Sequence, residues 1–147
     1  MRVIKRPEGS EAAKAGRILY VEDDDLNWTV MRELFADQYN ISRARTDEEF
    51  FAAVSNYDYD VVLMDIELSG SHANGIELVR QARDKNTKLT KLRDVPIVFV
   101  TAYSALYSRQ QLLEYGADDV TFKPVNPTGL KLVLSRLLMR SLHPPKP

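Results

Sequence analysis

Short runs of apolar and β-branched residues alternate along this chain with segments in which apolar residues recur at helical spacing. The runs predict five strands, at residues 17–21, 40–45, 60–64, 96–101 and 120–122. The other segments predict five helices, at residues 26–38, from 46 onward, and at 75–85, 108–115 and 127–141. Apolar strands that alternate with helices are typical of parallel sheets covered on both faces. The pattern therefore predicts an α/β fold with a doubly wound, five-stranded parallel sheet.

The first predicted helix carries an apolar stripe at helical spacing. Val30, Leu34 and Phe35 fall on one side and are expected to face the sheet. Trp28 lies about 160° around the helical wheel from Val30, at ~100° per residue. We therefore expect Trp28 to face solvent.

Composition and charge narrow the class of protein. The 147 residues fit one domain, which we expect at residues 16–142, after an N-terminal extension (1–15) and before a frayed tail (143–147). The net charge of -1 gives no basic excess for binding nucleic acid or an acidic membrane. No apolar run is long enough for a membrane span, and the N-terminus lacks the apolar segment of a secretory signal. We expect a cytoplasmic protein with no nucleic-acid and no membrane partner.

Polar residues with distinct chemistry stand at the predicted strand ends. Glu22 and Asp23 follow the first strand, and Asp65 follows the third. Thr101 closes the fourth strand, and Lys123 follows the fifth. Ligand sites in such sheets lie at the carboxyl ends of the strands. We therefore expect three carboxylates, a hydroxyl and an ammonium group at one edge.

This group of side chains predicts a cation site that handles phosphoryl groups. Clustered carboxylates repel one another, and a divalent cation relieves that repulsion. The chain has no cysteine and only 2 histidines, and oxygen ligands favour Mg²⁺, or Mn²⁺, over Zn²⁺. Lys123 and Thr101 can meet phosphate oxygens, and a carboxylate can serve as covalent acceptor.

Each of these residues also has an ordinary structural interpretation. Acids after a strand are usually helix caps, which suits Asp24 and Asp25. Thr101 alone is typical of a hydroxyl that satisfies backbone groups, and Lys123 alone of a solvated charge. Asp65 is harder to explain this way because it follows four apolar residues. The joint placement at strand ends favours the functional interpretation.

The chain resembles the receiver domains of two-component response regulators. The resemblance covers about residues 15–142, and it rests on the motifs RILYVEDD (17–24), VVLMDIE (61–67), NGIELV (74–79), VPIVFVTAYS (95–104) and GADDVTFKP (116–124). The stretch EDDDLN (22–27) is similar to receivers fused to hybrid histidine kinases. The resemblance implies the flavodoxin-like (βα)5 receiver fold.

The resemblance also implies a set of metal ligands. Asp23 is expected to bind Mg²⁺ directly, and Glu22 through water. Asp65 and the backbone carbonyl of Glu67 complete the expected protein ligands. Mn²⁺ is expected to substitute for Mg²⁺.

The implied reaction is phosphoryl transfer to Asp65. The donor would be the phosphohistidine of a histidine kinase or a histidine phosphotransfer protein. Thr101 would bond a phosphoryl oxygen, Lys123 would pair with the phosphoryl group, and the Lys123–Pro124 bond would be cis. The domain would catalyse its own phosphorylation and dephosphorylation without being a conventional turnover enzyme.

Three features depart from the family pattern. Val120 stands where the family has its switch aromatic, three residues before the lysine. Tyr103, two residues after Thr101, is the aromatic residue expected nearest to the site, and it is interpreted either as a gate to Asp65 or as an exposed loop residue. The loop at residues 66–74 is longer than usual and lacks the family proline, so we expect a more mobile, partner-specific loop. His72 in this loop is expected to be exposed rather than a ligand.

Two features of the sequence bear on its partners. In the last helix, Leu132 and Met139 fall opposite the core stripe, which indicates a surface for a partner or for a second copy of the chain. The resemblance to receiver domains implies a homodimer through the fourth and fifth helices. The chain ends 24 residues after Lys123, so we expect signalling through contact with a separate downstream protein.

Two alternatives stay open from the sequence. Asp65-Ile66-Glu67 superficially resembles the motif of a Mg²⁺-dependent phosphohydrolase, although that motif belongs on the first strand. A receiver that binds partners without phosphorylation is the other, although the chain keeps all of the core groups.

Overall fold

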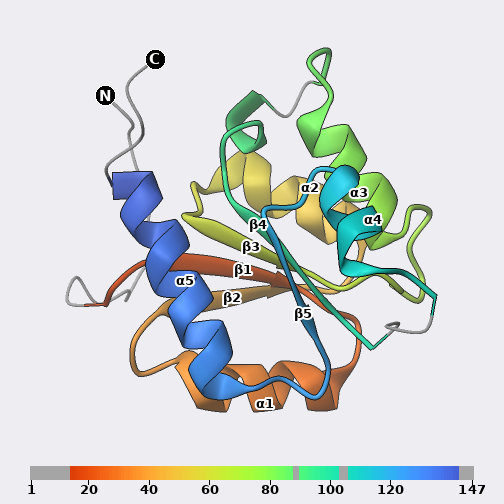
Figure 1. Ribbon diagram of the computed structural model, residues 1–147. Helices are drawn as coiled ribbons and strands as arrows, with labels where there is room; N and C mark the ends of the chain where they lie inside the picture. Colours follow the sequence, from red (N-terminus) through yellow and green to blue (C-terminus); the bar gives the residue numbers. More distant parts are fainter. Residues whose placement is uncertain (1–13, 88–89, 103–105, 143–147) are drawn as a thin grey trace.

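The fold is a five-stranded parallel sheet between two layers of helices (Figure 1). The computed structural model describes residues 14–87, 90–102 and 106–142. In chain order the elements are β1 (Arg17–Val21), α1 (Asp25–Phe35), β2 (Asn40–Ala44), α2 (Asp47–Asn56), β3 (Val61–Met64), α3 (Gly75–Arg83), the 3₁₀ turn η1 (Thr90–Leu92), β4 (Ile97–Thr101), α4 (Arg109–Glu114), β5 (Asp119–Phe122) and α5 (Pro127–Leu142). The strand order is β2-β1-β3-β4-β5, which confirms the predicted doubly wound fold.

Two hydrophobic layers hold the sheet. Alternate residues of a strand point to opposite faces, so Leu19 and Val21 of β1 pack under α2, α3 and α4. Ile18 and Tyr20 face the other layer, under α1 and α5. The inner strands β1, β3 and β4 are buried on both faces, whereas the edge strands β2 and β5 are partly exposed. The packed sheet therefore holds the carboxyl ends of its strands in fixed positions relative to one another.

The helices begin where the sequence supplies a cap. Asp24 caps α1 by accepting a hydrogen bond from the N–H of Asn27 at 2.8 Å. Thr46 caps α2 by accepting from the N–H of Glu49 at 3.2 Å. These caps place the acidic turn before α1 and the start of α2 beside the carboxyl ends of β1 and β2.

The predicted orientation of α1 was wrong for two residues. Val30 is 47% exposed, whereas Met31 and Phe35 are buried. Trp28 is partly buried, and the guanidinium groups of Arg32 and Arg43 each lie 5.9 Å from its ring centroid. The helix places its larger apolar side chains (Trp28, Met31 and Phe35) on the sheet, and this leaves the smaller valine outside.

The last helix exposes two apolar residues that the sequence places opposite its core stripe. Leu132 and Met139 are 68% and 57% exposed on α5, as predicted. The connection between α3 and β4 contains η1. Tyr103 and the predicted tail at 143–147 lie outside the described residues, as does almost all of the predicted extension at 1–15.

Candidate functional site

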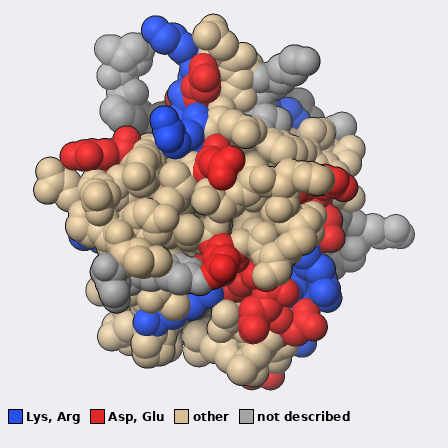
Figure 2. Space-filling view, turned by 90° about the vertical axis from the view of Figure 1, so that its right-hand side faces the viewer, with Lys and Arg blue, Asp and Glu red and all other residues tan. Residues whose placement is uncertain are grey.

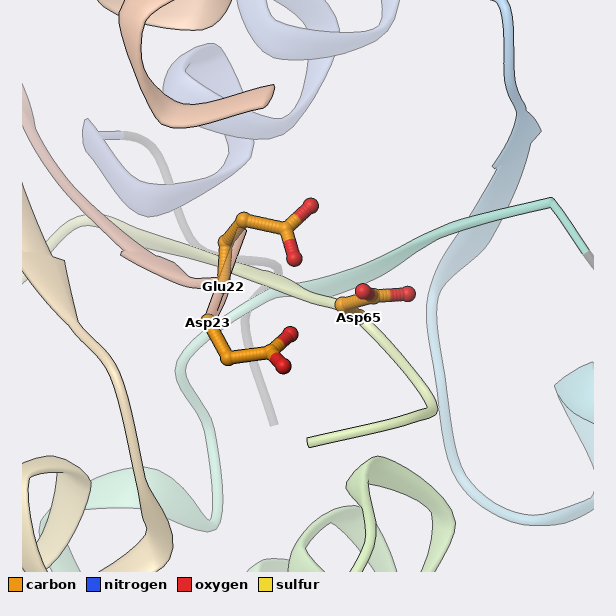
Figure 3. A group of neighbouring side chains, drawn as sticks. All are labelled: Glu22, Asp23 and Asp65. Carbon is orange, nitrogen blue, oxygen red and sulfur yellow. The ribbon is translucent and has the colours of Figure 1, made fainter. Parts of the chain in front are cut away.

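The site lies where β1 and β3 end side by side. Val21 pairs with Met64, so Glu22 and Asp65 are neighbours across the two strands, and the N–H of Asp65 donates to the Val21 carbonyl at 3.0 Å. Glu22, Asp23 and Asp65 each offer a carboxylate oxygen, and these oxygens lie within 4.8 Å of one another. Figure 3 shows the three carboxylates extending to the same side of the strand ends.

Lys123 places its ammonium group among these carboxylates. Its Nζ lies 2.6 Å from Glu22 Oε1 and 3.3 Å from Asp65 Oδ2. The N–H of Lys123 donates to the Thr101 carbonyl at 2.8 Å, which ties the end of β5 to the end of β4. The Lys123–Pro124 peptide bond is cis, as predicted from the resemblance. The buried Thr101 therefore ends β4 opposite Phe122, the residue just before Lys123.

Burial shapes the protonation of the carboxyl groups. Glu22 is 0% and Asp65 is 6% exposed. Burial, followed by the adjacent Glu22 carboxylate, raises the pKa of Asp65 to about 7. Burial also acts to raise the pKa of Glu22, but hydrogen bonds with Asp65 and Lys123 outweigh it and lower that pKa. Below about pH 7 the pair therefore holds its proton on Asp65, with Glu22 ionised.

Tyr20 and Arg43 contact the site, and the sequence analysis missed both. The Tyr20 hydroxyl donates to Glu22 Oε1 at 2.9 Å. Arg43 Nε donates to the Glu22 carbonyl at 2.9 Å, and Arg43 Nη1 lies 2.7 Å from Asp25 Oδ1. The two-residue period of a strand could have indicated Tyr20, because it shares a face of β1 with Glu22.

The loop at residues 66–74 is fastened at two places. The N–H of Ser69 donates to Asp23 Oδ2 at 3.0 Å. The buried Asp47, at the start of α2, accepts from the N–H groups of His72 and Ala73, each at 3.1 Å. The N–H of Asp47 donates to Ser71 Oγ at 3.0 Å. The side chain of His72 is 85% exposed, in agreement with its expected exposure.

Gly75 sets the distance between α3 and Asp65. Its N–H donates to the Ile66 carbonyl at 2.7 Å. A Cβ at this position would overlap the Asp65 carbonyl oxygen and lie 2.9 Å from the Ile66 Cα. The neighbouring atoms are backbone, so they cannot move aside by a change of rotamer.

We expect Gly75→Ala to lower the free energy of unfolding by about 2–3 kcal/mol, because the added methyl must displace backbone. Gly129→Ala is the matched control, since the nearest atoms to a Cβ there lie 3.7 Å away. Alanine favours a helix over glycine, so the control should keep or slightly raise stability. Urea denaturation of both variants tests this, and equal midpoints would contradict it.

The donor set suits a hard divalent cation. The converging groups of the described residues are all carboxylates, from Glu22, Asp23 and Asp65. Oxygen ligands of this kind favour Mg²⁺ or Mn²⁺. Two of the three residues are buried, where unpaired negative charge is costly. A cation would therefore offset the burial and the carboxylate repulsion that hold a proton on Asp65.

Two other residues singled out in the sequence, Glu67 and Val120, lie outside the group of three carboxylates. Glu67 follows Asp65 by two residues and has an exposed side chain, and the metal role of its carbonyl stays a prediction. Val120 is buried in β5, and its carbonyl accepts from Arg109 Nη1 of α4 at 3.1 Å.

The face that carries the strand ends has a group of acidic side chains near its centre (Figure 2).

Comparison with known proteins identifies the family of this chain. The model of the response regulator receiver domain matches residues 18–135. The chain belongs to this family. It is therefore a receiver domain of two-component signal transduction, as the motifs at the strand ends implied.

Relatives of this receiver domain include whole regulatory proteins. The aerobic respiration control protein ArcA of Escherichia coli (strain K12) is 32% identical over 86% of this chain and 50% of its own length. The transcriptional regulatory protein ResD of Bacillus subtilis (strain 168) is 32% identical over 85% of this chain and 49% of its own. The receiver domain thus spans about half the length of these relatives.

Solved receiver domains share the fold. The receiver domain of the sensor histidine kinase PA1611 from Pseudomonas aeruginosa PAO1 has a TM-score of 0.72 at 26% identity, over 84% of this chain and 98% of that one. That structure holds a magnesium ion coordinated in its active site cleft. A CheY-like receiver domain protein from Methanospirillum hungatei JF-1 has a TM-score of 0.70 at 30% identity, over 86% and 95%. Among the described residues of this receiver domain, no helix has the length and apolar character needed to span a membrane.

Proposed function

We propose that this receiver domain accepts a phosphoryl group on Asp65 from the phosphohistidine of a histidine kinase or a histidine phosphotransfer protein. The observation that carries the proposal is the geometry around Asp65. Its carboxylate lies beside those of Glu22 and Asp23 and 3.3 Å from Lys123 Nζ. An acceptor carboxylate beside a cation site and a fixed ammonium group is what phosphoryl transfer requires.

The transfer forms one bond and breaks another. An ionised Asp65 oxygen attacks the phosphorus atom, and the bond from phosphorus to the donor imidazole nitrogen breaks, which yields an acyl phosphate. Later attack by water returns inorganic phosphate and the free carboxylate. A bound Mg²⁺ supplies charge neutralisation between the acceptor and the phosphoryl oxygens.

The chain's own residues have separate tasks in this reaction. Asp65 must release its proton before it can attack. Glu22 and Asp23 supply the oxygens that, with Asp65, would hold the cation, together with the Glu67 carbonyl. Lys123 pairs with the charge that develops on the phosphoryl group, and the Thr101 hydroxyl bonds one of its oxygens.

Several finer points belong to the same proposal. The receiver acts in the cytoplasm, and it signals by contact with a downstream protein. The exposed Leu132 and Met139 support a homodimer through α4 and α5. The site supports phosphorylation over a phosphohydrolase because Asp65 follows β3 rather than the first strand.

Intact mass spectrometry tests the proposal. The protein is incubated with Mg²⁺ and acetyl phosphate, and we expect a gain of one phosphoryl group. The gain should be absent in Asp65→Asn and in excess EDTA. If a cognate kinase and small phosphodonors all fail to give the adduct, the domain instead binds partners without phosphorylation. Steady turnover of a phosphomonoester would support the phosphohydrolase.

A further inference from the structure

The side chain of Tyr20 reaches the site from inside the hydrophobic layer. It is 1% exposed and packs in the cluster under α1 and α5, with Phe35 and Leu130 among the members. Tyr20 and Glu22 are two residues apart, so the pleat of β1 turns both toward the same face. A phenol in a hydrophobic core needs a partner for its hydroxyl. Here the partner is a residue of the cation site.

The hydroxyl of Tyr20 shares one oxygen of Glu22 with Lys123. It donates to Glu22 Oε1 at 2.9 Å, and Lys123 Nζ lies 2.6 Å from the same oxygen. Burial, and then the nearby Glu22 charge, raises the pKa of Tyr20 far above its usual range. The phenol is therefore a permanent donor. The other oxygen, Oε2, accepts from the N–H of Asp24 at 3.3 Å.

These contacts fix the direction of a long side chain. A lysine carries its ammonium group on a flexible four-carbon stem, and Lys123 Nζ is shared with Asp65 Oδ2 at 3.3 Å. If Lys123 alone held Oε1, the Glu22 carboxylate could move whenever the ammonium group shifted toward Asp65. Tyr20 lies on a central strand in a packed core, so its hydroxyl is a fixed point. It holds the Glu22 carboxylate independently of Lys123.

We propose that Tyr20 is a positioning residue for the cation site, whose hydroxyl holds Glu22 where its carboxylate converges with those of Asp23 and Asp65. The inference rests on the proposed function for the cation site, and it assigns the tyrosine a role in Mg²⁺ affinity. Groups that orient metal ligands from behind typically change metal affinity by about 10–100-fold when removed.

The test is a calorimetric titration of the full chain with Mg²⁺ alone. We expect Tyr20→Phe to raise the Kd for Mg²⁺ about tenfold, because it removes only the hydroxyl. Tyr39→Phe is the matched control, since Tyr39 is buried in the same cluster beside the amino end of β2. Its Kd should stay within about twofold of the wild type. Near-ultraviolet circular dichroism of both variants checks that the core is unchanged.

A double-mutant cycle distinguishes positioning from packing. If Tyr20 acts through Glu22, then Tyr20→Phe should change the Kd less than about twofold in a Glu22→Gln background. An unchanged Kd in Tyr20→Phe, an equal loss in both backgrounds, or a wild type that does not bind Mg²⁺ would each overturn the inference. A wild type that binds Mg²⁺ but gives no acyl phosphate would instead overturn the proposed function. A wild type that is phosphorylated while Tyr20→Phe keeps its Kd would overturn the inference alone.

Discussion

Lys123→Met is expected to lower the free energy of unfolding by about 3 kcal/mol, and to slow phosphorylation of Asp65 by at least about a hundredfold. The loss of stability follows because Glu22 is ionised and fully buried, and Lys123 Nζ at 2.6 Å is its cation. Removing one partner of a buried ion pair leaves the other charge uncompensated. The loss of rate follows because no other described cation lies within 4 Å of Asp65.

Two measurements check this prediction. Urea denaturation in EDTA gives the stability, and intact mass with acetyl phosphate and saturating Mg²⁺ gives the rate. Lys91→Met is the control, because Lys91 is half exposed and its Nζ lies 3.5 Å from Asp58. Exposed pairs of this kind contribute at most about 1 kcal/mol. Equal losses in the two variants would show that the ammonium group of Lys123 has no special place in the site.

Added Mg²⁺ should restore part of the stability lost in Lys123→Met, because a divalent cation can compensate the same carboxylates. It should not restore the rate to the wild-type value, because the ammonium group that pairs with the phosphoryl group is still missing. This difference separates the two tasks of Lys123.

The positions of the main acids could be predicted from the sequence because parallel strands end at one edge of the sheet. Asp65 follows a run of buried apolar residues, and Glu22 follows the neighbouring strand, so only the strand order was needed to bring them together. Lys123 could be placed by the same rule. Local pattern and general topology were sufficient for these residues.

The connections between the elements could not be predicted in this way. Asp47 stands in the first turn of α2, where an acid is usually explained by the helix dipole. Its contacts with the N–H groups of His72 and Ala73 span 25 and 26 positions of the chain. They depend on how the loop at 66–74 folds back, which no local pattern records. The loop predicted to be more mobile is therefore one that α2 and Asp23 fasten.

The error on α1 has a similar origin. Val30 and Trp28 are both apolar, and the helical wheel does not tell which of two overlapping stripes faces the sheet. Arg43 contributes to the orientation of α1, because its side chain reaches from β2 over the Trp28 ring. That contact joins β2 to α1 and cannot be read from the helix alone.

The metal-free protein is expected to lose about 2 kcal/mol of stability as the pH rises from about 5 to about 8. The pKa of Asp65 is raised to about 7 in the fold, so Asp65 binds a proton there that the unfolded chain has already released. Stability from a raised pKa is present at low pH and is lost as the pH rises through the folded value. Glu22 has a lowered pKa, and its contribution is lost only at more acidic pH. The window therefore isolates Asp65.

Asp65→Asn should abolish this slope, since the amide does not ionise, and should exceed the wild type in stability by about 4 kcal/mol near pH 8, where Asp65 is ionised. Urea denaturation in EDTA at several pH values measures both proteins, and Asp37→Asn, at an exposed acid just after α1, should keep the wild-type slope. The same proton must leave when a cation binds, so Mg²⁺ affinity should rise up to about tenfold per pH unit below about pH 7. Calorimetry in two buffers of different ionisation enthalpy should detect about one proton released per Mg²⁺ near pH 6. If both the affinity and the stability were independent of pH, Asp65 would already be ionised in the fold, and the cation would have no proton to displace.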